Sequence, residues 1–308
     1  MILTVTANPT IDKVYFVDEL KIGEVHRPYK STATAGGKGI NVSRVAALLG
    51  EKTMALGFSG GKNGAFISGE LKKLGIIDRF TEVCGETRVN TNISDKFGNS
   101  TEILEAGPVI TEQEITALIS EFESAIDESD IICVAGSLPQ GTDSSLYKEF
   151  ISIAKSKNKK IIVDTSGAAL KEIIECSPFM VKPNRDEIKT LFGIKVEDEN
   201  DIKKALIMLH EKGIELPIIT LGGDGALAYI DNKFYRFSSP AVSGKNAVGS
   251  GDSTVAGIAV GISRGLSFID AVKLGMAAGT ANTQFDETGY VSKELVDKYL
   301  AEIKYEII

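Results

Sequence analysis

The sequence predicts an α/β protein with a mostly parallel central sheet, helices on both of its faces, and a second, small antiparallel sheet. From about Thr111 onward, short apolar segments alternate with amphipathic helical segments, which is typical of parallel strands joined by helices. Two other segments, about 12–34 and 87–105, contain short strands of alternating polarity with no helix between them. We therefore expect one domain, residues 1–308, with a β lid formed by these two insertions.

The individual elements are predicted in chain order from hydrophobic periodicity. Strands are predicted at residues 1–7, 14–17, 88–93, 131–135, 161–164 and 218–221. Helices are predicted at residues 41–49, 111–127, 144–157, 184–192 and 200–212, with three more between 250 and 299. The strands after residue 130 are almost continuously apolar, which indicates that both faces of the central sheet are covered.

Charge and hydropathy exclude two classes of partner. The formal net charge is −8, and the basic residues are scattered among acidic ones, which argues against a nucleic-acid surface. No segment approaches the roughly 20 apolar residues of a membrane span. The first residues, 1–7, have neither a basic flank nor a cleavage-site pattern, so a cytoplasmic location is expected.

Cysteine and histidine are too sparse to suggest a metal or redox centre. Cys84, Cys133 and Cys176 are odd in number and far apart, so we expect buried thiols and neither a disulfide framework nor a zinc site. His26 and His210 are the only histidines. Catalysis by histidine is therefore not expected.

A glycine-rich loop, residues 36–41 (Gly-Gly-Lys-Gly-Ile-Asn), precedes a predicted helix. Its glycines allow the backbone to approach a polar ligand closely, because no side chain intervenes. Lys38 adds a cation and Asn41 an amide that can bond hydroxyl groups. The alternative interpretation is a tight turn that enters a helix.

A second glycine-containing turn, residues 249–252, carries the stronger chemical signal, and we call it the anion turn. Gly249 and Gly251 leave backbone N–H groups accessible at the start of a helix of small residues. The helix dipole favours a negatively charged group there. Asp252 would lie in the first helical turn as a general base. The alternative is an aspartate that only stabilises a helix N-terminus. Neither the Walker loop nor the Rossmann fingerprint is present.

Two further segments follow apolar strands, where open α/β sheets bind ligands. In Lys182–Glu187, we expect Asn184 and Glu187 to hold the water shell of Mg²⁺, although the same pair also matches a helix capping box. Thr220–Ala226 is rich in glycine. It could pass beneath a nucleotide or simply turn a hairpin.

Together, these motifs resemble the PfkB family of carbohydrate kinases, also called ribokinase-like kinases, over essentially the whole chain. The motifs that carry the resemblance are Asn8–Asp12, Gly36–Asn41, Thr87–Asn90, Gly136–Pro139, Asp164–Gly167 and Gly249–Asp252. The resemblance implies a three-layer α/β/α sandwich, the ligands ATP and Mg²⁺, and a lid that closes on the sugar and pairs with its twin in a homodimer.

The resemblance also implies a role for each matching residue. Asp252 would be the base, with Gly249, Ser250 and Gly251 as the anion hole. The sugar phosphate would be bound by Asp12, Gly36, Gly37, Lys38, Asn41, Arg88, Asn90 and Ser137, with Arg27 as a helper. The ATP and Mg²⁺ side would be lined by Lys182, Asn184, Glu187, Thr220, Gly222, Gly225 and Asn282.

The similarity is greatest to the family branch that acts on hexose phosphates. Residues 101–108, Ser250 and residues 288–291 favour tagatose-6-phosphate kinase, whereas Ala247 departs from the usual residues of the turn. The expected reaction is ATP-dependent phosphorylation of tagatose 6-phosphate to the 1,6-bisphosphate, and the alternative substrate is fructose 1-phosphate. A non-catalytic sugar- or nucleotide-binding regulator is the alternative from another class. Arg88 disfavours a ribose or nucleoside kinase, because a neutral sugar offers a guanidinium no partner.

Overall fold

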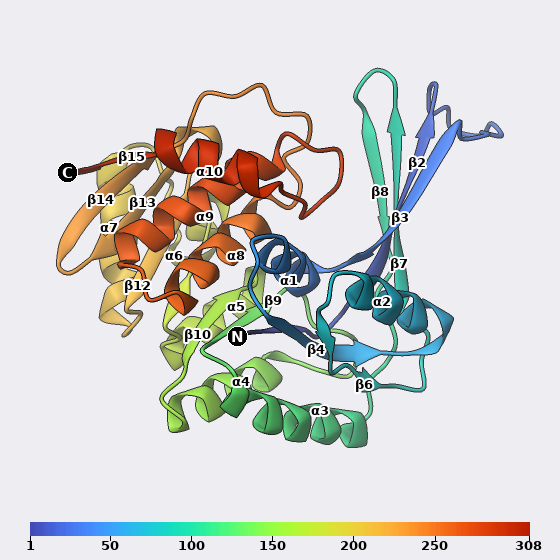
Figure 1. The fold of residues 1–308 in the computed structure, drawn as a ribbon, viewed down its shortest axis with the longest axis horizontal. Coiled ribbons are helices and arrows are strands. Elements are labelled where there is room, and N and C mark those ends of the chain that lie inside the picture. The colour runs from blue at the N-terminus through green and yellow to red at the C-terminus, as the bar shows by residue number, and fades with distance from the viewer.

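A large mixed sheet forms the centre of the computed structural model, which describes residues 1–308 (Figure 1). Its strand order is β15-β14-β13-β12-β11-β10-β9-β1-β4-β5, with β6 also paired to β4. Pairing is parallel from β12 through β9 and β1 to β4, and antiparallel from β12 to β15. The strands are β1 (Ile2–Thr6), β4 (Thr53–Ser59), β5 (Ile77–Asp78), β6 (Thr81–Glu82), β9 (Ile131–Ala135), β10 (Lys160–Asp164), β11 (Met180–Val181), β12 (Leu216–Thr220), β13 (Ala226–Ile230), β14 (Lys233–Ser238) and β15 (Lys304–Ile307).

Helices cover both faces of this sheet, as predicted. One face carries α1 (Lys38–Leu48), α8 (Ser250–Ser263), α9 (Phe268–Asn282) and α10 (Lys293–Glu302), with α2 (Gly61–Lys73) beside α1. The other face carries α3 (Glu112–Ala125), α4 (Ser144–Ser156), α5 (Gly167–Ile173), α6 (Arg185–Phe192) and α7 (Glu199–Glu211). The three predicted C-terminal helices are confirmed as α8, α9 and α10, whereas α2, α5, β4, β14 and β15 were not predicted.

Side chains along each central strand point alternately to the two faces of the main sheet, which explains why both faces are apolar. In β9, Ile131 and Cys133 pack into the core under α1 and α8, while Ile132 and Val134 pack into the core under α3 and α4. Successive strand residues point to opposite faces, so a strand that is buried on both sides must be apolar throughout.

Helix α8 is held against α9 by glycine contacts that leave no room for larger side chains. A Cβ atom at Gly257 would lie 2.6 Å from the carbonyl oxygen of Leu274, and one at Gly261 would lie 2.7 Å from the Cα of Ala271. The small-residue sequence of α8 thus lets two buried helices pack backbone to backbone. This packing fixes the position of the helix whose first turn contains Asp252.

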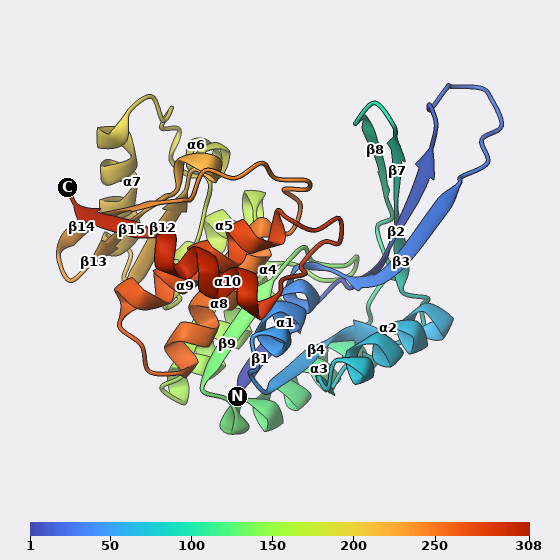
Figure 2. The ribbon, with the colours of Figure 1, turned by 45° about the horizontal axis from the view of Figure 1, so that its top comes forward.

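The lid is a four-stranded sheet that projects away from the main body (Figure 2). Its order is β3-β2-β7-β8, with β2 (Thr10–Val17), β3 (Lys30–Gly36), β7 (Arg88–Asp95) and β8 (Ser100–Leu104). Antiparallel pairing is confirmed within the two hairpins, β2–β3 and β7–β8, but β2 and β7 pair in parallel. No short turn joins these two central strands, so nothing in the local chain forces them to be antiparallel.

Two smaller predictions can also be compared with the structure. Cys133 is buried and its burial raises the pKa of the thiol, but Cys84 is exposed, so the prediction of buried thiols was wrong there. Cys176 is partly buried. None of the helices combines the length and apolar character needed to cross a membrane.

Candidate active site

A cavity of about 1170 Å³ lies between the lid and the carboxyl ends of the main-sheet strands. Ser137 lines it just after β9, Thr165 just after β10, and Asn8 after β1. Mostly even-numbered residues of the lid strands form the opposite wall. Ligands of open α/β sheets bind at this edge, where the carboxyl ends of parallel strands meet.

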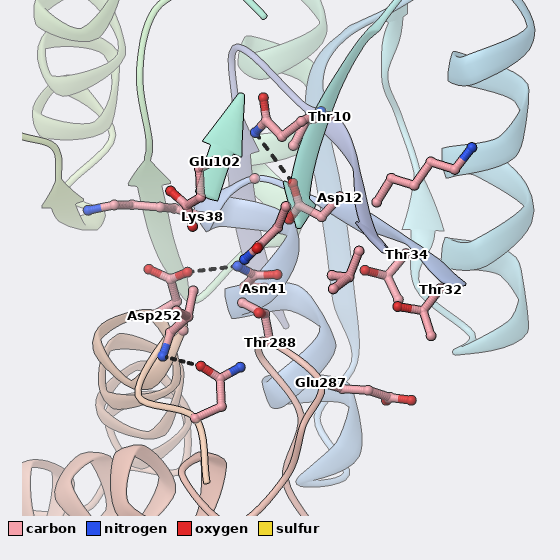
Figure 3. A pocket seen from close by; sticks show the side chains of 18 of the residues that line it. Thr10, Asp12, Thr32, Thr34, Lys38, Asn41, Glu102, Asp252, Glu287 and Thr288 are labelled. Carbon is pink, nitrogen blue, oxygen red and sulfur yellow. Dashed lines mark hydrogen bonds between the residues drawn. The ribbon is translucent and has the colours of Figure 1, made fainter. Parts of the chain in front are cut away.

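Asp252 and Asn41 meet at one end of this cavity (Figure 3). Asn41 Nδ2 donates a hydrogen bond of 2.8 Å to Asp252 Oδ2, and Oδ1 of Asp252 accepts no bond from the protein. Asp252 is only 7% exposed, and this burial, together with the nearby Asp164 carboxylate, raises its pKa to about 6. The second oxygen of an unusually basic carboxylate is therefore left for a ligand in the cavity.

The anion turn presents free backbone donors beside this carboxylate. Gly249 is the N-cap of α8 and has a φ of 82°, a left-handed conformation that favours glycine. A Cβ atom there would also lie 2.6 Å from the backbone nitrogen of Gly289. The N–H groups of Gly249, Gly251 and Asp252 have no acceptor in the protein. The helix start can thus receive an anion.

Asn282, which was predicted to line the ATP side, is buried behind the anion turn. Its side chain is completely buried, and Nδ2 donates to the carbonyl of Val248 at 2.9 Å. Its Oδ1 accepts bonds from the Ser253 hydroxyl and from the N–H of Tyr290, both at 3.2 Å. With its amide used inside the protein, Asn282 holds the anion turn in shape and does not face the cavity.

Two lysines near the turn share a buried carboxylate, Asp164, at the end of β10. Lys38 Nζ lies 3.3 Å from Asp164 Oδ2, and Lys182 Nζ lies 3.9 Å from Oδ1. Burial opposes ionisation of Asp164, but the two ammonium groups outweigh it and lower its pKa. The ammonium of Lys182 also lies next to Gly251 in the anion turn. Positive charge is therefore held beside the free N–H groups.

Polar groups of the lid and of the strand leading into it form the other side of the cavity. Asp12 carries a carboxylate whose pKa is raised, chiefly by burial, and Asn90 Nδ2 donates to its Oδ1 at 3.4 Å. Oδ1 of Asn90 is buried without a partner. Gly36 leaves the space that Asp12 occupies, because a Cβ atom there would overlap the carboxylate. An unpaired amide oxygen beside a carboxylate suits the hydroxyl groups of a sugar.

Arg88 lines the cavity, but most of its guanidinium is already bonded to the backbone. It donates to the carbonyls of Asn8 at 2.9 Å, Glu105 at 3.0 Å and Pro9 at 3.4 Å. Three of the five N–H hydrogens of a guanidinium are thereby used, which leaves two for a ligand phosphate. Arg88 therefore also ties the base of the lid together.

Asn184 and Glu187 form the capping box of α6. Asn184 Oδ1 accepts from the Glu187 N–H at 2.9 Å, and Glu187 Oε2 accepts from the Asn184 N–H at 2.8 Å. No group of three or more metal-ligating side chains is present. The pair keeps one free carboxylate oxygen and the Asn184 NH₂ group. This set fits Mg²⁺ held through water and does not fit an ion held directly by side chains.

None of the residues predicted on the ATP side lines the cavity, Asn184 and Glu187 included. Thr220 ends β12, and the glycines after it turn the chain into β13, as in the hairpin alternative. Gly225 is required there, because its φ is 94° and a Cβ atom would overlap the Phe237 carbonyl oxygen. Gly222 begins the short 3₁₀ turn of this hairpin. A role for these residues in nucleotide binding stays a prediction.

The cavity brings together most of the residues predicted for the sugar and the base. It is lined by Asp12, Gly37, Lys38, Asn41, Arg88, Asn90, Ser137, Gly249 and Asp252. Gly36, Ser250 and Gly251 adjoin these residues in the chain without lining the cavity. Arg27 lies in the loop between β2 and β3, away from the lining.

Three residues of the site were given no role from the sequence, although Asp164 begins one of the motifs that carry the resemblance. Asp164 ends an apolar strand, and a carboxylate at that position is a signal that could have identified it. Arg44 interrupts a run of small and apolar residues on α1, which is a signal for a buried cation that has partners. Glu102 faces the cavity from β8 (Figure 3), and the sequence holds no clear signal for it.

A buried, basic carboxylate beside free N–H groups and two lysines defines a site for phosphoryl transfer to a hydroxyl group. Comparison with known proteins identifies the family. The profile of the pfkB family of carbohydrate kinases matches residues 5–294, and the chain belongs to this family. The resemblance inferred from the motifs is therefore confirmed.

Individual relatives agree with this assignment. The 1-phosphofructokinase of Bacillus subtilis is 36% identical over 304 residues, which cover 99% of each chain. The structure of Escherichia coli phosphofructokinase-2 in complex with potassium matches with a TM-score of 0.90 and 27% identity, over 98% of each chain. Ribokinase from Thermotoga maritima matches with a TM-score of 0.80 and 24% identity, over 98% of this chain and 99% of that one, which confirms the ribokinase-like fold.

Proposed function

We propose that this carbohydrate kinase uses ATP to phosphorylate a ketohexose monophosphate to a 1,6-bisphosphate, and that fructose 1-phosphate is the preferred substrate. The observation that carries the kinase reaction is the pairing of Asp252 with Asn41 at the anion turn, which leaves one carboxylate oxygen facing the cavity. Similarity along the full chain to a 1-phosphofructokinase supports fructose 1-phosphate. It outweighs the few residues that favoured tagatose 6-phosphate.

In this proposal Asp252 removes the proton from the primary hydroxyl of the sugar. Its pKa of about 6 keeps it ionised at neutral pH yet makes it a stronger base than an ordinary carboxylate. The free N–H groups of Gly249, Gly251 and Asp252 stabilise the charge on the transferring phosphoryl group. Lys38 and Lys182 add positive charge on the same side of the cavity.

ATP supplies the phosphoryl group, and Mg²⁺ would offset the charge of its phosphates when bound. Asn184 and Glu187 would hold the water shell of the ion, since the capping box leaves them one carboxylate oxygen and one NH₂ group. On the sugar side, Asp12 and Asn90 would bind hydroxyl groups. The two free N–H hydrogens of Arg88 would bind the phosphate already present on the substrate.

A coupled ADP-release assay tests the substrate. We expect kcat/KM for fructose 1-phosphate to exceed that for tagatose 6-phosphate and fructose 6-phosphate by at least about tenfold, because buried polar groups placed for the hydroxyl and phosphate groups of one isomer are left unpaired by another. A preference for tagatose 6-phosphate would reject the proposed substrate and retain the kinase. Turnover of none of the three would favour the non-catalytic regulator.

We also propose that the chain forms a homodimer through the lid. Large apolar side chains are exposed on the lid strands and loops at Ile22, Val25, Tyr29, Phe97 and Ile103. Such a group on one element is typical of a protein interface. One relative, the E. coli phosphofructokinase-2, has an inhibited form described as tetrameric. Light scattering coupled to gel filtration would test the proposal, and a monomer at micromolar concentration would reject it.

A further inference from the structure

Arg44 lies one helical turn after Asn41 on α1, and its guanidinium is buried behind the site. Nη1 donates to Asn41 Oδ1 at 2.9 Å and to the carbonyl of Thr288 at 3.0 Å. Nη2 donates to the carbonyl of Ala35. These acceptors belong to α1, to the loop after α9 and to the end of β3. Arg44 is 9% exposed and does not line the cavity, so it can act on a ligand only through another residue.

The amide of Asn41 stands between two groups of opposite hydrogen-bonding character. A guanidinium can only donate, and an ionised carboxylate can only accept. With Oδ1 facing Arg44, the NH₂ group must face Asp252, and Nδ2 indeed donates to Oδ2 there. A flipped amide would place donor against donor at Arg44 and acceptor against acceptor at Asp252. Arg44 thereby dictates the orientation of Asn41.

We propose that Arg44 is a positioning residue of the kinase, which orients the Asn41 amide so that it donates to Asp252 and keeps that carboxylate ready to accept a proton. The proposal rests on the function of Asp252 proposed above. The loop after α9 strengthens the arrangement. Gly289 packs closely enough on Asn41 that a Cβ atom would lie 2.8 Å from the Asn41 Cβ, so the amide has little room to move.

The charges around the two groups determine the direction of the expected effect. Burial and Asp164 raise the pKa of Asp252, whereas Lys38, the Asn41 hydrogen bond and Lys182 lower it. Losing the Asn41 donation must therefore raise the pKa of Asp252 further. The charged groups that face Arg44 itself are Asp12 on β2, Glu287 in the loop after α9, Glu70 on α2 and Asp252 on α8.

The test is the pH dependence of kcat in Arg44→Met, which removes the donors but keeps the length of the side chain. We expect the acid limb to move upward by roughly one pH unit, with a loss of kcat that is roughly threefold at pH 6.5 and approaches about tenfold well below pH 6. Asn41→Ala should produce a similar shift, and the double variant should shift no further, because both changes remove the same hydrogen bond. Arg44→Lys, which can reach one acceptor, should shift less.

Arg264→Met is the matched control. Arg264 also donates to a backbone carbonyl near α1, that of Leu49 at its C-terminal end, and lies far from the cavity. This variant should retain the wild-type pH profile. The proposal is overturned if Arg44→Met loses activity with an unshifted acid limb, or if its shift adds to that of Asn41→Ala. If Arg44→Met does not fold, the same comparison with Arg44→Lys decides.

Titration of Asp252 by carboxyl ¹³C NMR separates this proposal from the proposed function. The Asp252 signal is assigned by its loss in Asp252→Asn, and the wild type is compared with Arg44→Met. An unchanged titration would overturn the role of Arg44 even if the enzyme is active. A raised pKa would support that role even if the wild type phosphorylates none of the sugars tested, an outcome that would count only against the proposed function.

Discussion

The two walls of the cavity differ in how their side chains are held. On the main-domain wall, Asp252 and Asn41 are less than 10% exposed, and a hydrogen bond joins them across α8 and α1. On the lid wall, polar side chains such as Thr32 and Glu102 project from an open sheet (Figure 3). In the proposed function, the buried wall holds the groups that carry out the chemistry, and the more exposed lid wall supplies contacts to the sugar.

Replacing the base should have the largest effect. Asp252→Asn removes the proton acceptor but keeps the shape, so we expect kcat to fall by at least about a hundredfold while the Kd for the sugar phosphate changes little. Steady-state kinetics and isothermal titration calorimetry would measure the two quantities separately. If kcat stays within about tenfold of the wild-type value, Asp252 is not the base.

The pH dependence should follow the ionisation of the same residue. Because the pKa of Asp252 is raised to about 6, kcat should fall about tenfold per pH unit well below pH 6. Asp164→Asn should move this limb downward, since the Asp164 carboxylate raises the pKa of Asp252. A limb near pH 4, the range of an ordinary carboxylate, would contradict the buried environment.

The buried ion pairs should matter for both stability and activity. Asp164→Asn leaves Lys182 buried without a counter-charge, so we expect a loss of roughly 2–3 kcal/mol in the free energy of unfolding and roughly tenfold in kcat/KM for ATP. Lys38 is partly exposed, which limits the cost on its side. Urea denaturation would measure the stability. The exposed Asp130→Asn, a matched surface change, should lose less than about 1 kcal/mol.

On the lid wall, the effect should fall on substrate affinity. Asp12→Asn should raise KM for the sugar phosphate by roughly tenfold while kcat changes less than about threefold, because in the proposed function Asp12 binds hydroxyl groups and not the transferring phosphate. An equal loss of kcat and kcat/KM would show that the lid wall takes part in the chemistry. That outcome would remove the distinction between the two walls.

The smallest effect should be a gain in stability. The raised pKa means that the folded state holds the Asp252 proton more tightly than the unfolded chain between about pH 4 and 6. Ionisation at neutral pH therefore costs stability, and Asp252→Asn should raise Tm by a few degrees at pH 8 and by less at pH 5. Differential scanning fluorimetry at both pH values would check this. A lower Tm at pH 8 would contradict the direction of the pKa shift.

Much of this could be predicted from local sequence patterns. The alternation of apolar strands and helices predicted the parallel sheet, and the helix-free insertions predicted the separate lid sheet. The anion-binding turn at Gly249 and the base Asp252 were predicted from neighbouring residues alone. The hairpin after Thr220 and the capping box of α6 were also recognised, as alternatives, from their spacing.

Other features depend on contacts between distant segments, which local patterns do not contain. Asn41 and Asp252 are 211 residues apart, and Lys38 and Asp164 are 126 residues apart. The order of strands β10, β9 and β1 brings their ends together at one edge of the sheet. For the same reason, the parallel pairing of β2 and β7 and the bonds of Arg88 to lid carbonyls were not predicted.

By itself, the sequence determined most of the strands and helices around the site, where the backbone is left open by glycine, and which residue can serve as a base. Only the tertiary structure decided the charge state and orientation of that base. A pKa depends on desolvation and on charges within a few ångströms, and an amide orientation depends on what lies on its two sides. Both are properties of the packed site around Asp252, to which Asn41 and Arg44 of α1, Asp164 of β10 and Lys182 just after β11 contribute.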